Sequence, residues 1–371
     1  MQPASVTPLG TGRGASSRGL RIAMVAPPYF PLPPVGYGGV EAVVAALVDE
    51  LVDRGHHVTL VGAGRNGTRA QSFLSTNPEA SAAQLGESLP EVVHAARVAE
   101  LLAGRDVDLV HDHTLAGPLL ARGRSLPTVV TVHGPATGDM ADLYRALGDS
   151  VRLIGISDSQ RAAAPQLPWL ATVHNGIAVA SFPLQVEKDD VALFLGRFHP
   201  EKAPHLAIDA ARAAGLPIVL AGKCSEPIEH AYFAREVEPR LGPDVEIFGV
   251  ADGEQKRRLL ARACCLLFPI CWEEPFGLVM IEAMACGTPV VALRRGAVPE
   301  IVVDGVTGVI VDEPGELPDA IRLARQLDPH DCRAQVERDF STATMATGYE
   351  LAYRRLLDEA GGTARAVRAS R

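Results

Sequence analysis

Residues 273–289 read Glu-Glu-Pro-Phe-Gly-Leu-Val-Met-Ile-Glu-Ala-Met-Ala-Cys-Gly-Thr-Pro and lie between two apolar stretches, Cys265–Phe268 and Pro289–Ala292. Short apolar runs of this kind predict buried strands, and the segment between them is long enough for a crossover helix. Because proline is favoured at the first position of a helix, we expect the helix to begin near Pro275. The stretch therefore predicts a β-α-β unit of a parallel sheet.

Two carboxylates of this segment, Glu274 and Glu282, suit an elongated ligand with a charged middle. The amides of Phe276, Gly277 and Leu278 would point outward from the helix start, and such a terminus attracts phosphate. With a rise of ~1.5 Å per residue, Glu282 would lie ~10 Å beyond Glu274. That is roughly the span from a sugar ring to a ribose across a pyrophosphate, so we expect one carboxylate at each end.

The same alternation of apolar runs with helical-period segments continues along the chain and predicts two doubly wound parallel sheets. A chain of 371 residues also fits two domains of ~150–200 residues each. The expected strands of the first sheet are Ile22–Ala26, Val58–Val61, Leu109–His111, Thr128–Val132 and Leu153–Ile156. Those of the second are Val191–Leu195, Ile218–Ala221, Val245–Phe248, Cys265–Phe268, Pro289–Ala292 and Val309–Val311.

The chain divides into five expected segments. A turn signal at Asn175-Gly176, followed by the charged run Glu187–Asp190, indicates the boundary between the two sheets. The periodic stretch Phe340–Leu357 indicates a terminal helix. The segments are a disordered extension over 1–20, an N-terminal Rossmann-like domain over 21–182, a C-terminal Rossmann-like domain over 183–340, a helix over 341–358 and a disordered tail over 359–371.

Composition excludes several classes of protein. A formal net charge of −9 argues against a nucleic-acid partner, which would require a basic face. Six cysteines without metal-type spacing indicate buried free thiols in a reducing compartment. The first twenty residues lack the apolar core of a signal peptide, which predicts a cytoplasmic protein. No apolar run reaches the ~18–20 residues that span a bilayer, which leaves open only peripheral contact with a membrane.

A Glu, seven residues and a second Glu, within Glu274-Pro275-Phe276-Gly277 and followed by Glu282-Ala283-Met284-Ala285-Cys286-Gly287-Thr288-Pro289, resemble the donor-site signature of retaining glycosyltransferases of family 4. The resemblance extends from Arg21 to about Leu357, and the runs Pro27–Glu41 and Arg294–Glu300 are similar to the avilamycin-type branch. It implies the GT-B fold, two Rossmann-like domains facing a central cleft. It also implies retaining transfer from a nucleotide-sugar, with UDP-sugar favoured and GDP-mannose second, to an unknown acceptor, without metal or cofactor.

Two fixed cations, Arg197 and Lys202, follow the first strand of the second domain. An Arg fork and a Lys point charge over one loop can clamp a diphosphate and stabilise the charge that grows on it as it leaves. The alternative is an ordinary surface ion pair of either cation with Glu201. The resemblance implies that the matching Arg and Lys contact the donor phosphates, although Ala203 stands where the family usually has Gly.

Other polar or glycine-rich positions lie just after strands, where open α/β sheets bind ligands. His133 is such a residue; a lone strand-end His is usually a structural hydrogen-bonder, but the resemblance implies contact with the donor sugar. Gly38 and Gly39 open a helix, where bare backbone can approach a phosphate or simply form a flexible turn. His111 and His113 lack a third ligand at recognisable spacing, so we favour hydrogen bonding over a metal site.

The expected site follows. Glu274 would bind donor sugar hydroxyls, Glu282 the ribose, and the edge at Phe248 and Val250 resembles the family's base-binding edge, although the core explains Phe248 equally well. The expected catalytic residues are His133, Arg197, Lys202 and Glu274, and the expected donor-binding residues are Gly38, Gly39, Phe248, Val250, Pro275, Phe276, Gly277, Leu278 and Glu282. Two alternatives remain open: a GT-B-fold sugar-nucleotide epimerase, and a nucleotide-sugar-binding protein without catalysis.

Overall fold

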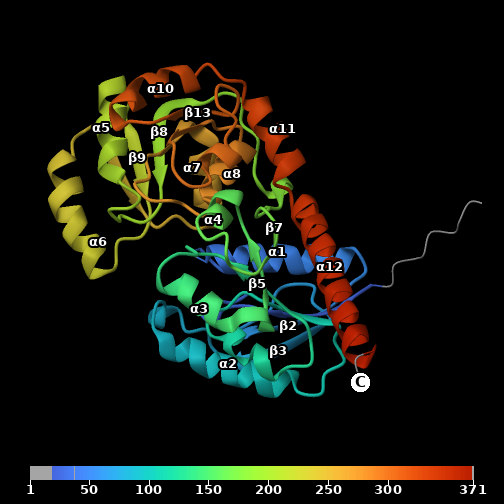
Figure 1. Cartoon of the computed structure of the whole chain (residues 1–371). Helices are drawn as coiled ribbons and strands as arrows, with labels where there is room; N and C mark the ends of the chain where they lie inside the picture. Colours follow the sequence, from blue (N-terminus) through green and yellow to red (C-terminus); the bar gives the residue numbers. More distant parts are fainter. Residues whose placement is uncertain (1–18, 37, 370–371) are drawn as a thin grey trace, which may run out of the picture.

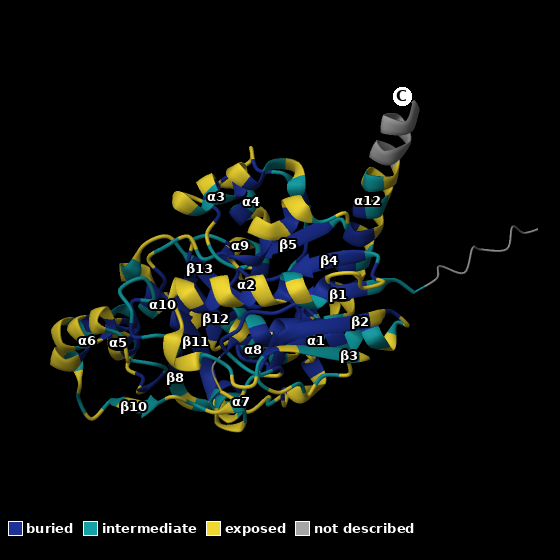
Figure 2. Ribbon diagram, turned by 90° about the horizontal axis from the view of Figure 1, so that it is seen from below, coloured by how far each residue is buried: buried dark blue, intermediate teal, exposed yellow. Residues whose placement is uncertain are grey.

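The structure, a computed structural model, describes residues 19–36 and 38–369, so the extension predicted over 1–20 lies almost entirely outside the described residues. Two parallel sheets, each covered by helices, form the two halves of the molecule (Figure 1). The interior strands of both sheets are buried, whereas the edge strands are partly exposed, as are the outward faces of helices such as α2 (Ser88–Leu102) and α6 (Pro227–Tyr232) (Figure 2). The predicted two-domain, doubly wound architecture is confirmed.

The first domain contains a seven-stranded sheet in the order β3-β2-β1-β4-β5-β6-β7. Its strands are β1 (Arg21–Val25), β2 (His57–Ala63), β3 (Ser72–Asn77), β4 (Leu109–Asp112), β5 (Thr128–Val132), β6 (Arg152–Gly155) and β7 (Trp169–Thr172). Its helices are α1 (Gly39–Asp53), α2 (Ser88–Leu102), α3 (Asp139–Leu147) and α4 (Asp158–Ala162). The sequence did not predict β3 and β7, because both lie at sheet edges and lack the apolar run of a strand that is buried on both faces.

The second domain contains a six-stranded sheet in the order β10-β9-β8-β11-β12-β13. Its strands are β8 (Asp189–Leu195), β9 (Ile218–Ala221), β10 (Val245–Gly249), β11 (Ala263–Phe268), β12 (Val290–Leu293) and β13 (Gly308–Val311). The helices that follow β8 are α5 (Pro204–Ala214), α6 (Pro227–Tyr232), α7 (Gly253–Arg262), α8 (Leu278–Ala285), α9 (Val298–Ile301), α10 (Leu317–Ala324), α11 (Pro329–Asp339) and α12 (Thr342–Ala369).

Both sheets reverse their strand order at an interior point, between β1 and β4 in the first and between β8 and β11 in the second. In open α/β sheets the crevice outside the carboxyl ends of strands at such a switch point is where ligands bind. The loops after these four strands carry most of the predicted site residues. The topology therefore places the candidate residues of each domain at the carboxyl ends of the strands, beside the switch point of its sheet.

Helix α12 returns from the second domain to the first and lies alongside it (Figure 1). Its buried residues Met345, Tyr349, Tyr353 and Leu356 belong to the same apolar cluster as α1 and the first sheet. At the crossing, the amide of Ile177 donates to the Phe340 carbonyl at 2.9 Å, and the amide of Thr342 donates to the Ile177 carbonyl at 3.1 Å. The two connections between the domains are thus hydrogen-bonded to each other.

Two predicted helix limits are wrong. The helix expected near Pro275 begins at Leu278, because Gly277 adopts a left-handed φ of 84° at its N-cap and Phe276 turns into the core. Glu274 therefore lies in the loop before α8, not on the helix. The terminal helix continues to Ala369 instead of ending at residue 358, since the tail is rich in the strong helix formers Ala and Arg.

Two further observations concern cysteines and membranes. All six cysteines are free, as predicted, but Cys271 is exposed and Cys224 half-buried, so the expectation that all six are buried is wrong. Cys271 lies in the loop after β11, outside the apolar strand context. Among the described helices, none combines the length and apolar composition required to cross a bilayer.

Candidate functional site

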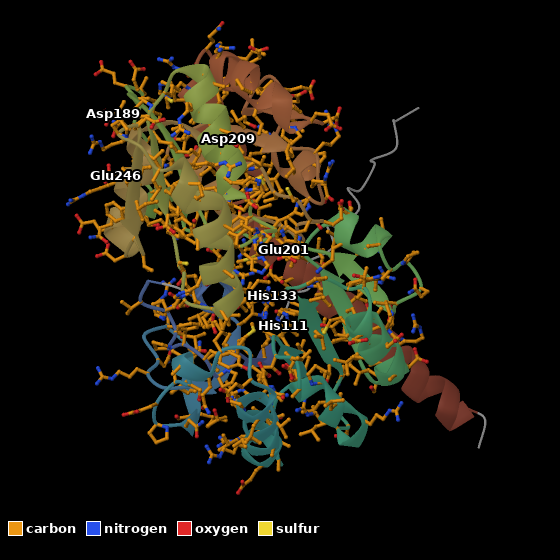
Figure 3. The ribbon with its side chains drawn as sticks, turned by 90° about the vertical axis from the view of Figure 1, so that its left-hand side faces the viewer. His111, His133, Asp189, Glu201, Asp209 and Glu246 are labelled. Atoms are coloured by element: carbon orange, nitrogen blue, oxygen red, sulfur yellow. The ribbon has the colours of Figure 1, made fainter. Side chains whose placement is uncertain are left out.

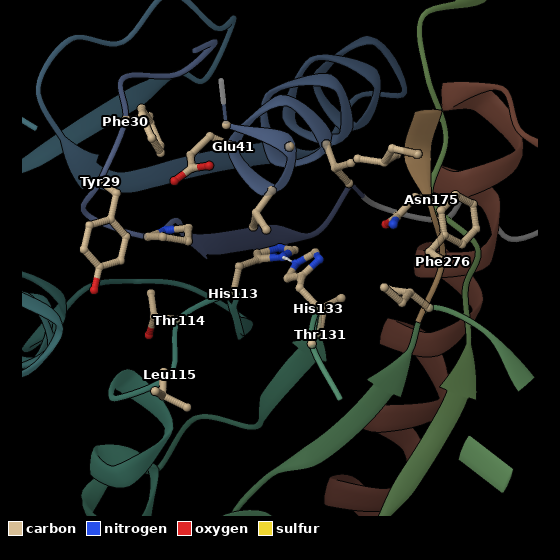
Figure 4. Close-up of a pocket in the computed structure, with 18 of the residues that line it drawn as sticks. Tyr29, Phe30, Glu41, His113, Thr114, Leu115, Thr131, His133, Asn175 and Phe276 are labelled. Carbon is tan, nitrogen blue, oxygen red and sulfur yellow. Dashed lines mark hydrogen bonds between the residues drawn. The ribbon is translucent and has the colours of Figure 1, made fainter. Parts of the chain in front are cut away.

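A cavity of about 450 Å³ lies between the two domains. Figure 3 shows His133 on the side of the first domain that faces the second, and Figure 4 shows the cavity from close by. Seven of the predicted residues line it: Gly38, Gly39, His133, Glu274, Phe276, Gly277 and Leu278. Segments far apart in sequence, from both domains, therefore meet at one site.

Two helix N-termini meet in the wall of this cavity. Helix α1 begins at Gly39 and α8 begins at Leu278, and both residues line the cavity. A Cβ placed on Gly39 would lie 3.3 Å from the Leu278 Cδ1, so the two helix starts are in contact. The first amides of a helix have no partner within it and carry partial positive charge. The arrangement is suited to a ligand with negative charge at its centre.

The Glu274 carboxylate is held by two side chains of its own domain. It forms an ion pair with Lys202 and accepts a hydrogen bond from Trp272 Nε1 at 3.0 Å. The Lys202 ammonium also lies 5.1 Å from the centre of the Trp272 ring, within the range of a cation–π interaction. Two residues that were predicted separately, Lys202 and Glu274, thus neutralise each other in the ligand-free protein.

Gly296 fixes the backbone of the Glu274 loop. A Cβ at Gly296 would lie 2.3 Å from the Glu274 carbonyl oxygen, and the residue has a left-handed φ of 52°. The neighbouring Ala297 amide donates to the same carbonyl at 2.9 Å. Any side chain at position 296 would displace the loop that carries the carboxylate. Gly296 therefore controls the position of Glu274 without touching the cavity.

Arg197 extends from the end of β8 toward a buried acid. Its Nη1 lies 3.7 Å from Glu229 Oε1 and 4.0 Å from Glu226 Oε1. The Glu229 side chain is fully buried, and its other oxygen accepts the amides of Ser225 and Glu226. The predicted alternative, pairing of Arg197 or Lys202 with Glu201, is wrong, because among the described residues both cations pair elsewhere and Glu201 lies 3.3 Å from His199.

A chain of hydrogen bonds determines which nitrogen of His133 carries the proton. His113 Nε2 lies 3.1 Å from the Met24 sulfur, which can only accept, so we place the proton of His113 on Nε2. His113 Nδ1 then accepts from His133 Nε2 at 2.8 Å. Burial lowers the pKa of His133 to about 4 and holds that of His113 well below its usual range, so both rings are neutral near pH 7. The Nδ1 of His133 remains as a hydrogen-bond acceptor.

His111 connects this pair to the returning helix. Its ring centre lies 4.0 Å from that of His113, and its nitrogens bond Tyr353 at 2.7 Å and Thr131 at 2.8 Å. The hydrogen-bonding interpretation of His111 and His113 is thereby confirmed. Among the described residues, no group of three or more His, Cys, Asp or Glu side chains is arranged to hold a metal ion.

The remaining predicted residues lie outside the cavity wall. Glu282 pairs with Lys256 of α7 at 2.6 Å, one helix turn beyond the start of α8. Pro275 is buried. Phe276, which lines the cavity, is also buried, and its ring packs against Phe340. The Phe248 side chain packs on the core, as its alternative interpretation held, whereas Val250 is 61% exposed.

Sequence reasoning missed several residues of the site. Glu41, Glu91 and Tyr29 line the first-domain side of the cavity. Glu41 is the last residue of the run Pro27–Glu41, which is similar to the avilamycin-type branch. The signal in the sequence was a carboxylate two positions after Gly39. Trp272 and Gly296 are recognised only through their contacts with Glu274: Trp272 lies in the same loop, and Gly296 lies in the loop after β12.

Glu300 links the two domains beside the site. Its carboxylate accepts the amides of Asp158 and Ser159 at 2.7 and 2.6 Å, and it lies 3.1 Å from His174 Nε2. Glu300 therefore satisfies the first amides of α4 from the opposite domain. Its role in the structure is therefore that of a helix cap.

Comparison with known families covers most of the chain. Residues 37–181 match the model of Glycosyltransferase Family 4, and residues 180–335 match the model of Glycosyl transferases group 1. The D-inositol 3-phosphate glycosyltransferase of Mycobacterium tuberculosis is 32% identical over 258 residues, which are 58% of this chain and 53% of that protein. The chain thus spans about half the length of the curated relatives it matches.

Solved structures show the same fold. AviGT4, a glycosyltransferase involved in avilamycin A biosynthesis, is 28% identical, with 91% of this chain and 98% of that chain covered at a TM-score of 0.69. Anabaena HepE in complex with UDP-glucose is 19% identical, with coverages of 88% and 97% and a TM-score of 0.67, a likeness of fold alone. The predicted GT-B fold and the likeness to the avilamycin-type branch are confirmed.

Proposed function

Since the chain belongs to the family 4 glycosyltransferases, we propose that it transfers a sugar from a nucleotide-sugar donor to an acceptor hydroxyl with retention at the anomeric carbon. The observation that carries the proposal is the meeting of two helix N-termini in one cavity, with Lys202 and Glu274 paired beside them. Helix starts and fixed cations are the groups that bind a diphosphate. UDP-sugar is the favoured donor and GDP-mannose the second, from the family resemblance.

Donor binding would exchange the partner of Lys202. The diphosphate at the starts of α1 and α8 would attract the Lys202 ammonium away from Glu274 and Arg197 away from Glu229. Glu274, still oriented by Trp272, would then accept hydroxyls of the donor sugar, and the Nδ1 of His133 would accept another. Lys202, Arg197 and the helix amides would stabilise the charge of the leaving diphosphate.

The donor side of the site can be tested by thermal unfolding with UDP, GDP, ADP and dTDP in turn. A ligand at ~100 times its dissociation constant adds roughly 2.7 kcal/mol to the stability of the folded state. We expect UDP to raise Tm most, and GDP next. Equal shifts with all four, or none, would contradict a nucleotide-sugar site. Release of free UDP from UDP-sugar with no glycosylated product would instead favour the epimerase.

Chelation should not affect the reaction. Arg197, Lys202 and the two helix starts supply the positive charge that a divalent cation would otherwise supply to the diphosphate. We therefore expect the rate of sugar transfer to be the same with and without excess EDTA. Loss of transfer in EDTA, with recovery on adding Mg²⁺ or Mn²⁺, would show that these groups are insufficient.

A further inference from the structure

On the first-domain side of the cavity lies a carboxylate that is paired with no other side chain among the described residues. Glu41 is the third residue of α1, its side chain is 3% exposed, and Figure 4 shows its carboxylate directed to the space beside Tyr29 and Phe30. Among the described residues, the hydrogen-bond donor to this carboxylate is its own backbone amide. A buried acid without a partner costs free energy in a dry site unless a ligand supplies one. Glu41 therefore points to a ligand with a hydrogen-bond donor.

A second carboxylate lines the same part of the cavity. Glu91 of α2 is 7% exposed and accepts the amides of Leu115 and Ala116 at 3.3 and 3.4 Å. Burial raises the pKa of Glu41 to about 7, with a smaller contribution from the negative charge of Glu91, and burial also raises the pKa of Glu91. This end of the cavity is thus acidic and short of positive charge.

Among the described residues of the cavity wall, no cationic side chain compensates these two acids. Among the described residues that line the cavity, there is no Lys or Arg. The two histidines, His113 and His133, are neutral near pH 7 because burial lowers their pKa values. Lys202 pairs with Glu274 and belongs to the other side of the site. A phosphate or carboxylate group placed between Glu41 and Glu91, away from the start of α1, would meet two buried acids without a cationic side chain.

From this arrangement we infer the charge class of the acceptor, on the basis of the proposed function. The acceptor is a polyhydroxylated ring that carries a protonated amine, and the amine binds at Glu41, with its hydroxyls beside Glu91 and Thr114. With a neutral ring the Glu41 carboxylate has no counter-charge and is readily protonated, because its pKa is raised, whereas an ammonium group supplies donors and a charge that keep it ionised. An acceptor with a phosphate on the ring, as the name of the mycobacterial relatives implies for those proteins, is excluded.

The test compares scyllo-inosamine with scyllo-inositol, which has a hydroxyl in place of the amine in the same configuration, and inositol 3-phosphate with myo-inositol, which lacks the phosphate. Each is titrated by calorimetry into the protein saturated with UDP, at a pH about one unit above the Glu41 pKa of about 7. A hydrogen bond to a charged group contributes ~1.5–3 kcal/mol, so we expect the amine to bind at least about 10-fold tighter than scyllo-inositol. The phosphate should not bind detectably.

Two variants distinguish the effect of the Glu41 charge on amine binding from the effect of removing any carboxylate of the same domain. In Glu41→Gln the advantage of the amine should fall to within about threefold of scyllo-inositol, because the amide retains the size but not the charge. In Glu79→Gln, which removes an exposed carboxylate of the same domain, the tenfold advantage should remain. Tight binding of the phosphate, an amine preference that persists in Glu41→Gln, or no amine binding while UDP binds normally would each overturn the inference. Failure to bind UDP at all would overturn the proposed function and, with it, this inference.

Discussion

Replacing Glu274 by Gln will lower kcat/KM for sugar transfer by about 100-fold or more, which corresponds to ~2.7 kcal/mol of lost transition-state stabilisation. The carboxylate lies on the cavity wall and is the group we expect to accept the donor sugar hydroxyls. Gln can still accept the hydrogen bond of Trp272 Nε1, so the loop should keep its position. The effect should therefore come from the lost charge, measured as steady-state kinetics with the best donor.

For the affinity of UDP, we expect the same variant to have no effect or the opposite effect. Lys202 loses its partner in Glu274→Gln and becomes available to the diphosphate, so UDP should bind as tightly as to the wild type or more tightly. Glu246→Gln removes an exposed carboxylate on the outer side of the same domain (Figure 3) and should leave both measurements unchanged. Transfer at the wild-type rate in Glu274→Gln would remove this residue from the site.

Replacing Tyr349 by Ala will destabilise the first domain by about 3–5 kcal/mol, the range for truncating a large buried aromatic side chain. Tyr349 is fully buried, bonds Thr131 at 3.0 Å and packs 4.9 Å from the His111 ring. The loss of stability should be measured by urea denaturation, as the decrease in the midpoint of the unfolding transition of the first domain. It should be larger than that of Tyr349→Phe, which removes only one hydrogen bond of about 1 kcal/mol.

A matched position on the same helix provides the control. Leu351 is 62% exposed on α12, so Leu351→Ala should change stability by no more than about 0.5 kcal/mol. If Tyr349→Ala were as stable as Leu351→Ala, the helix would not contribute to the core of the first domain. The packing and the hydrogen bond of Tyr349 would then contribute nothing measurable to the free energy of unfolding.

The strands that could be predicted from the sequence are those that are buried on both faces of their sheet. Strands such as Ala263–Phe268 are continuous apolar runs, because parallel strands are covered by helices on both sides, and such runs are visible in a single sequence. The edge strand Ser72–Asn77 has no such run and was missed. The start of α8 was misplaced because the proline preference at Pro275 was outweighed by the left-handed Gly277 and the burial of Phe276.

The predictable part of the site was the set of residues that follow strands. His133 and Glu274 could be found there because parallel strands all end at the same edge of their sheet. Pairings could not be predicted: Lys202 and Glu274 are 72 residues apart, and only the fold brings them together. Glu41 escaped notice because an acid in the first turn of a helix is adequately explained by the helix dipole alone.

The return of α12 also has a consequence for biosynthesis. Residues Met345, Tyr349, Tyr353 and Leu356 complete the apolar cluster of the first domain, yet they are translated after the whole second domain. Domains usually fold as units while the chain emerges from the ribosome, the earliest first. Here the first domain cannot complete its apolar cluster until the second domain has been synthesised. The nascent chain would thus expose the α1 side of its first sheet throughout most of elongation, a surface for chaperones to cover.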